Sequence, residues 1–190
     1  MASWQDEVLD FWFGELTHED RFGGAAEVDQ KIRNRFEPLY RKLAAAIPQE
    51  ALKDSRTALA TAIVYDQFPR NMYRRRAEAF ATDTMATQVA RNALDNGLDA
   101  GLAPEQKPFL YMPFMHSEVL ADQERCVDLF KSTGNEEAIK YAVEHRDIIA
   151  RFGRFPHRNK ALGRKSIADE VEFLKGHSGY GQKSDEPEEA

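Results

Sequence analysis

The residues best suited to chemistry lie in two segments that repeat one phrase. Residues 66–71 read DQFPRN and residues 154–159 read RFPHRN, so each joins Phe-Pro to Arg-Asn, with a histidine inserted the second time. A guanidinium group presents a planar fork of N–H donors that matches a carboxylate or a phosphate. Proline stops a helix, and asparagine tolerates the backbone of a tight turn. The phrase is therefore typical of a basic loop that follows a helix and holds arginines around an anion.

Positive charge is concentrated around both copies of the phrase. The chain of 190 residues has a net charge of −6, yet residues 145–165 carry five Arg, two Lys and one Asp, a balance of +6. Residues 66–76 carry four Arg and one Asp, a balance of +3. The same pattern also suits plain helix termination, because cations complement the negative end of a helix. We expect the two copies to leave their helices at one end of the molecule and to close a common site.

Two further stretches carry acids and histidines, MHSEVLADQERC at 115–126 and EHRDIIAR at 144–151. A histidine beside a carboxylate is the smallest set of groups that performs general acid–base catalysis. Apolar neighbours at helical spacing direct the side chain of His145 inward. The candidates for proton transfer are His116, Glu118, His145 and Asp147. The candidates for ligand binding are Asp66, Arg70, Asn71, Asp122, Arg151, Arg154, His157, Arg158 and Asn159.

Other chemistries are less favoured. His116, Glu118 and His145 offer atoms that bind metal ions, but their spacing matches no specific ligand motif, and a histidine bonded to a carboxylate is the preferred interpretation. Cys126, the single cysteine, lies among apolar neighbours and is expected to pack as a small hydrophobe. The sequence has no glycine-rich phosphate loop and no dinucleotide fingerprint. It therefore predicts neither a metal nor a cofactor.

The elements that must position these residues are helices. Apolar residues recur at helical spacing along the chain, and no segment alternates like a strand. The sequence predicts an all-α bundle or stack of about seven to eight helices, with Ser3 and Asn135 among the caps and Gly153 at one helix end. Pro38 is expected to kink one helix, and Pro113 either to divide residues 104–130 into two helices or to kink a single one.

Composition limits the class of protein. With 42% apolar and 31% charged residues the chain is ordinary for a globular protein, and we divide it into one domain at 1–176 and a flexible acidic tail at 177–190. The N-terminus resembles no secretory signal, and no apolar run approaches the roughly 20 residues that cross a membrane. We therefore expect a cytoplasmic protein without membrane contact. The acidic balance also argues against nucleic acid as a partner.

Five motifs stand out as a set. They are VLDFWFGE at 8–15, DQFPRNMYR at 66–74, AFATD at 79–83, FLYMPFMHSEVLADQE at 109–124 and HRDIIARFGRFPHRNKALGR at 145–164. Together they resemble the DUF924 family of uncharacterised, mainly bacterial proteins, from about residue 4 to about residue 175. The resemblance implies an all-α fold grouped with tetratricopeptide-like helical proteins. It implies no activity, cofactor or catalytic residue.

Three hypotheses of function are open from the sequence. The first is a basic pocket, lined by Arg, His and Asp, that binds a small anionic ligand such as a phosphate or a carboxylate. The second is a helical interaction module that binds an acidic peptide or a partner protein. The third is a buried Arg–Asp–His network with a purely structural role. The sequence decides neither whether catalysis follows binding nor what the oligomeric state is.

Overall fold

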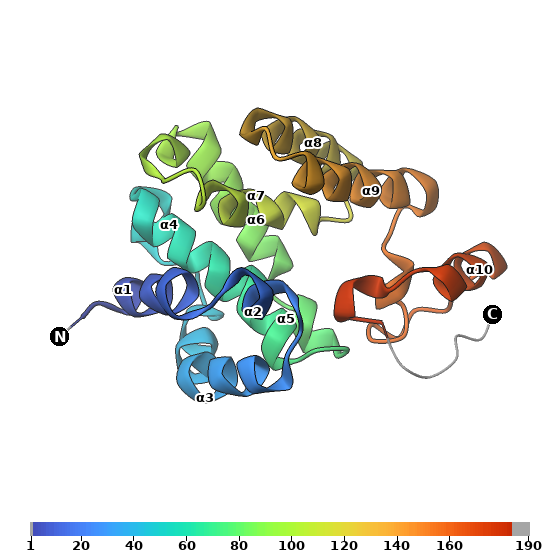
Figure 1. The fold of residues 1–190 in the computed structure, drawn as a ribbon, viewed down its shortest axis with the longest axis horizontal. Helices are drawn as coiled ribbons and strands as arrows, with labels where there is room; N and C mark the ends of the chain where they lie inside the picture. Colours follow the sequence, from blue (N-terminus) through green and yellow to red (C-terminus); the bar gives the residue numbers. More distant parts are fainter. Residues whose placement is uncertain (1, 184–190) are drawn as a thin grey trace.

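A computed structural model describes residues 2–183, and in this range every regular element is a helix (Figure 1). The predicted all-α class is therefore confirmed, and the tetratricopeptide-like arrangement stays a prediction. None of the helices described is both long and apolar enough to cross a membrane. The helices are α1 (Trp4–Leu9), α2 (His18–Phe22), α3 (Ala26–Leu43), α4 (Ser55–Ala62), α5 (Phe68–Met72), α6 (Asp83–Asp95), α7 (Lys107–Met115), α8 (Leu120–Thr133), α9 (Glu136–Phe152) and α10 (Ala168–Gly176).

Local sequence signals fix several helix ends. Ser3 and Asp6 form a reciprocal capping box at the start of α1, which satisfies N–H groups that the helix itself cannot. Asn135 caps α9 by accepting from two backbone N–H groups in its first turn, each at 3.1 Å. Gly153 ends α9 with a φ of 68°, a left-handed conformation that costs glycine little. These three ends agree with the predictions.

Both prolines that were expected to disturb helices lie inside helices, and the kink at Pro38 stays a prediction. α3 runs through Pro38 without interruption, and α7 contains Pro113. The predicted break between helices falls at residues 116–119, after Pro113 rather than at it. Each proline removes one N–H donor, yet α3 buries an apolar stripe that includes Ile32 and Phe36. Tertiary packing of this stripe holds the helix in place despite the missing hydrogen bond.

The first copy of the phrase does not end its helix. α4 continues through a π-helical turn at Ile63–Gln67 into α5, so the chain stays helical as far as Met72. Pro69 lies in the first turn of α5, a position where proline is tolerated. The expectation that both copies form loops after helices is therefore wrong for this one.

The second copy does leave its helix. After Gly153 the chain turns away from α9, and Pro156–Arg158 form a short 3₁₀ turn. Residues 154–183, which we call the C-terminal arm, contain this turn and α10. Figure 1 shows the arm, in orange to red, at one end of the molecule beyond α9.

The apolar core is divided unequally between the body and the arm. One large cluster extends through α1 and α3 to α9 and buries large side chains such as Trp12. A much smaller cluster contains Ile148 and Ile149 of α9 and Phe155 of the arm, with Tyr180 at its edge. The free energy gained by burying apolar side chains is roughly proportional to the buried area, so this small cluster stabilises the arm only a little. Polar contacts must therefore supply much of the free energy that attaches the arm to the body.

The chain stays packed beyond the predicted domain end. Gln182 is buried, and its Nε2 donates to the carbonyl of Arg70 at 3.0 Å. Its Oε1 accepts from the backbone N–H of Arg75 at 3.1 Å. Residues 177–183, which the sequence analysis assigned to the tail, thus belong to the folded arm, and residues 184–190 lie outside the described residues.

Candidate functional site

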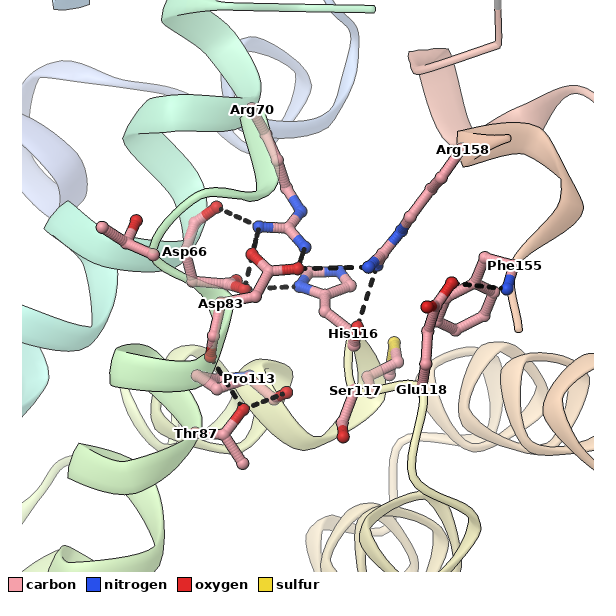
Figure 2. A network of polar contacts seen from close by, with 12 residues as sticks. Asp66, Arg70, Asp83, Thr87, Pro113, His116, Ser117, Glu118, Phe155 and Arg158 are labelled. Atoms are coloured by element: carbon pink, nitrogen blue, oxygen red, sulfur yellow. Dashed lines mark hydrogen bonds and ion pairs between the residues drawn. The ribbon is translucent and has the colours of Figure 1, made fainter. Parts of the chain in front are cut away.

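The two copies of the phrase meet on one carboxylate. Asp83, the first residue of α6, accepts two hydrogen bonds from Arg70 of the first copy, at 2.8 and 2.9 Å. Its Oδ2 also accepts from Nη1 of Arg158 of the second copy, at 3.1 Å. Figure 2 shows both guanidinium groups directed at Asp83. The expected meeting is confirmed, although one copy is helical and the other is a loop.

A carboxylate–histidine pair lies beside this junction. Asp66 is fully buried, and its Oδ1 lies 2.7 Å from Nδ1 of His116. Burial raises the pKa of Asp66, but the charge of Arg70 and the contact with His116 lower it more, so the net shift is downward. Burial and Arg70 lower the pKa of His116. The ionised carboxylate accepts from Nδ1–H of a neutral imidazole, which leaves a lone pair on Nε2.

His145 has the same tautomer for a different reason. Its Nδ1 lies 2.7 Å from the carbonyl oxygen of Tyr141, and a carbonyl only accepts, so Nδ1 carries the proton. Burial, followed by the nearby His116, lowers the pKa of His145 to about 3. Its ring stacks on Tyr180 of the arm, 4.1 Å between centroids, and lies 6.2 Å from the ring of His116. Both imidazoles are therefore neutral and present Nε2 lone pairs.

The space beside these two Nε2 atoms is reached by solvent. Neither Nε2 atom has a hydrogen-bond partner among residues 2–183. Some unpartnered polar atoms are inaccessible to solvent, but these two are not among them. The exposed fraction is 17% for the side chain of His116 and 4% for His145. Two atoms of the arm, Nε of Arg158 and Nδ1 of His157, are sealed from solvent without a partner. The region therefore holds more hydrogen-bonding capacity than the described chain uses.

Arg158 lies against two aromatic rings and is bound through both outer nitrogens. Its Cζ is 4.6 Å from the ring centroid of Phe80 and 4.5 Å from that of Phe155. Nη2 donates to the carbonyl of His116 at 2.9 Å, in addition to the bond from Nη1 to Asp83. Burial lowers the pKa of Arg158 to about 10, so the side chain is cationic at neutral pH. It connects the arm to the start of α6 and the end of α7.

Other charged residues around the second copy fix the arm itself. Arg154 binds Glu170 of α10 through two bonds of 2.6 and 2.7 Å. Arg164 binds Glu118 through bonds of 2.7 and 3.0 Å, and Glu118 also accepts from the backbone N–H of Phe155 at 2.8 Å. Arg154 was a candidate for ligand binding and Glu118 for proton transfer. In the structure both hold the loop in position.

Five other candidates lie away from the two Nε2 atoms. Asn71 donates to a backbone carbonyl one turn earlier, and Asn159 donates to a serine and a glutamate within the arm. Asp122 pairs with an arginine of α6. Asp147 pairs with its sequence neighbour, and Arg151 lies over the ring of the residue that follows it. The structure therefore brings together Asp66, Arg70, His116, His145, His157 and Arg158.

Three residues of this cluster were not predicted. Asp83 is at a helix start, where an acid is common for electrostatic reasons alone, so its role as the anchor of two arginines is not visible in the sequence. Phe80 and Asp83 belong to the AFATD motif, which is the signal that could have indicated them. Tyr180 lies in the segment assigned to the tail.

Within the part of the chain that the structure describes, no three or more His, Cys, Asp or Glu side chains are arranged to hold an ion. Of the less favoured metal set, His116 and His145 are near one another, but Glu118 is directed to Arg164.

Comparisons with known proteins agree with the helical fold and supply no activity. The family model described as "Bacterial protein of unknown function (DUF924)" matches residues 8–178. A solved structure, the protein of unknown function ATU0120 from Agrobacterium tumefaciens, is 33% identical with a TM-score of 0.86, and the match covers 92% of this chain and 98% of that one. No curated protein matches the chain.

Proposed function

Because the chain belongs to the DUF924 family, which is described as having no known function, we propose a function from the geometry of its site. The protein binds a small anionic ligand, a carboxylate or a phosphate, at the Nε2 atoms of His116 and His145 beside Arg158. We call this place the histidine crevice.

The observation that carries the proposal is the set of hydrogen-bonding atoms that the described residues leave unused. Nε2 of His116 and Nε2 of His145 have no partner among residues 2–183, and the rings of the two histidines lie 6.2 Å apart. The buried guanidinium group of Arg158 lies beside them and is bonded to Asp83 and to the carbonyl of His116. Electrostatic interactions are strong where water is largely excluded. An anion that enters the crevice therefore meets unused hydrogen-bonding atoms beside a cationic side chain.

Binding is expected to carry a proton with it. His116 and His145 are neutral because burial lowers the pKa of each. A bound negative charge favours the imidazolium form and raises the pKa again. Protonation at Nε2 then creates N–H groups that donate charge-assisted hydrogen bonds to the anion.

Thermal unfolding in the presence of anions tests the proposal. Sulfate, phosphate and succinate are compared with chloride at equal ionic strength, for the wild type, His145→Gln and the control His18→Gln, which changes an exposed histidine of α2. A ligand at about 100 times its Kd stabilises the folded state by about 2.7 kcal/mol, or about 5–10 °C in Tm for a domain of this size. We expect this shift in the wild type and His18→Gln, and its loss in His145→Gln.

A shift of equal size in all three proteins would contradict the proposal, as would the absence of any shift. The second result is what a purely structural network predicts, with His145→Gln changing only the Tm without ligand. Arg158 is unsuitable as a probe because it holds the arm in place, so its loss would change folding and binding together.

A further inference from the structure

A concave surface lies along α9, and its lining residues do not include those of the histidine crevice. It has a volume of about 480 Å³. One wall is a face of α9 between Ile139 and Phe152, and the other is Phe173 of α10. We call it the α9 groove.

Apolar side chains that are only partly buried line much of the α9 groove. Ile139, Val143 and Phe152 all belong to α9, and all three are half-buried. The ring of Phe152 contacts that of Phe173 at 5.2 Å between centroids. Phe152 and Phe173 pack against the small cluster that attaches the arm, whereas Ile139 and Val143 pack against the large core.

A stripe of charged residues runs beside the apolar one. Lys140, Glu144, Asp147 and Arg151 are spaced at i, i+4, i+7 and i+11, so the helix places all four on one side, with the bases at the two ends. The spacing of eleven residues between the bases corresponds to three turns and ~16 Å.

The two acids of the stripe are engaged elsewhere. Glu144 accepts from the Tyr180 hydroxyl at 2.8 Å and contacts Nε2 of His177 at 3.1 Å, while Asp147 accepts from Arg146 at 2.8 Å. The i, i+4 pairs that these acids would otherwise form with the two bases of the stripe do not occur.

The two bases of the stripe are consequently uncommitted. Lys140 is exposed and makes no ion pair or hydrogen bond with the described residues. Arg151 is also exposed, lies over the ring of Phe152, and makes no ion pair or hydrogen bond with residues 2–183. The α9 groove thus combines an apolar wall with a free positive charge at each end.

We propose that the α9 groove docks an amphipathic helical segment of a partner protein, with apolar side chains on one face and a carboxylate near each end. Helix-in-groove recognition uses an apolar face as its anchor, and complementary charges set the register and exclude basic partners. The carboxylates lie about three helical turns apart, opposite Lys140 and Arg151. This interaction does not depend on the histidine crevice.

Fluorescence anisotropy with designed peptides tests this surface. The acidic probe is a labelled helical peptide with leucines on one face and glutamates about three turns apart, and its matched partner has lysines in place of those glutamates. They are titrated with the wild type, with the double variant Lys140→Glu/Arg151→Glu, and with Lys53→Glu, which makes the same charge change at an exposed lysine outside the groove.

We expect the preference between the acidic and the basic peptide to reverse between the wild type and the double variant. The wild type and Lys53→Glu bind the acidic peptide at least about 10-fold more tightly than the basic one, and the double variant prefers the basic peptide, since opposite charges must face each other. Phe173→Ser weakens both peptides. A preference that survives in the double variant, or binding of neither peptide by the wild type, would overturn the proposal.

Two controls keep the result clear. Thermal unfolding confirms that each variant is folded, and Lys140→Gln/Arg151→Gln replaces the reversal variant if that one is not. A self-association of the chain that the double variant abolishes would assign the groove to a second copy and would also overturn the proposal. Neither double variant of Lys140 and Arg151 should affect the anion-induced Tm shift. A failure of the proposal for the α9 groove can therefore be distinguished from a failure of the proposal for the histidine crevice.

Discussion

The two copies of the Phe-Pro phrase share their residues but not their structure. The first lies within a continuous helical segment, and its Phe68 is fully buried in the large core. The second is a loop with a 3₁₀ turn, and its Phe155 is fully buried in the small cluster of the arm. Both present an arginine to Asp83. The repeated phrase thus indicates which two segments converge. It does not determine the backbone conformation of either segment, which depends on tertiary packing.

The two copies also differ in the kind of interaction that stabilises the part of the molecule around each of them. The first copy rests on extensive apolar packing. The second depends on charged contacts, through Arg158 to Asp83 and through Arg164 to Glu118. Substitutions at the junction should therefore act on the arm more than on the body, and four predictions test this difference.

The largest effect is expected for Asp83→Ala. This change leaves the buried guanidinium groups of Arg70 and Arg158 without their shared carboxylate, and breaking a buried ion pair costs about 3–5 kcal/mol. Urea unfolding measures the loss. The matched control is Asp95→Ala, which removes an exposed pair with Arg125 and should cost about 1 kcal/mol or less. Equal losses in the two variants would mean that Asp83 is not the anchor.

Phe68→Ala and Phe155→Ala distinguish the two copies directly. Each removes a fully buried ring, at a cost of about 3–5 kcal/mol. The loss at Phe68 should lower global stability, whereas the loss at Phe155 should open the arm alone. Hydrogen exchange measures this, because amides of residues 155–183 then exchange faster in Phe155→Ala while those of α4 keep their protection. Uniform loss of protection in both variants would refute the division between body and arm.

The next effect is a dependence of stability on pH. The pKa of His145 is lowered in the folded state from 6.5 to about 3. Above pH 6.5 neither state binds the proton, and as pH falls further the unfolded chain takes it up while the folded protein does not. Stability should therefore fall by about 2 kcal/mol between pH 6.5 and pH 5, and continue to fall towards pH 3. His157 shifts in the same direction and adds to this loss.

Chemical unfolding as a function of pH checks the sign and the source of this effect. His145→Gln should flatten the curve between pH 6.5 and pH 5, and His18→Gln, at an exposed position, should leave it unchanged. A wild-type curve without any slope in this interval would show that His145 is not buried in its neutral form.

The smallest effect concerns the prolines. Pro69 lies in the first turn of α5, where a helix tolerates proline, so Pro69→Ala should be nearly neutral. Pro156 is the first residue of the 3₁₀ turn in a loop, where proline restricts the unfolded chain, so Pro156→Ala should cost about 0.4–1 kcal/mol. Thermal unfolding of the two variants measures the difference, and the opposite order would contradict the assignment of helix and loop.

The sequence was sufficient where structure is determined locally. The caps at Ser3 and Asn135 and the end at Gly153 follow from backbone chemistry within a few residues. Among residues 2–183 there are seven longer helices, in agreement with the seven to eight expected, while α1, α2 and α5 contain only five or six residues each. The clustering of arginine around the two phrases correctly indicated which segments converge.

The sequence was insufficient where contacts join distant segments. Asp83 is an ordinary helix-start acid until the fold places two arginines over it, and these lie 13 and 75 positions away. Pro69 falls where a helix tolerates proline, which the phrase alone does not reveal. Tyr180 lies in a polar segment and packs only because the arm returns to α9. Such pairings depend on tertiary packing rather than on local propensity.

Calorimetric titration of the protein with sulfate tests the central claim, the histidine crevice, most directly. Sulfate binds no proton near neutral pH, so comparing buffers of different ionisation enthalpy reports proton uptake by the protein alone. We expect binding accompanied by proton uptake at pH 6.5, with both lost in His145→Gln and retained in His18→Gln. Binding without proton uptake, or equal binding by His145→Gln, would contradict it.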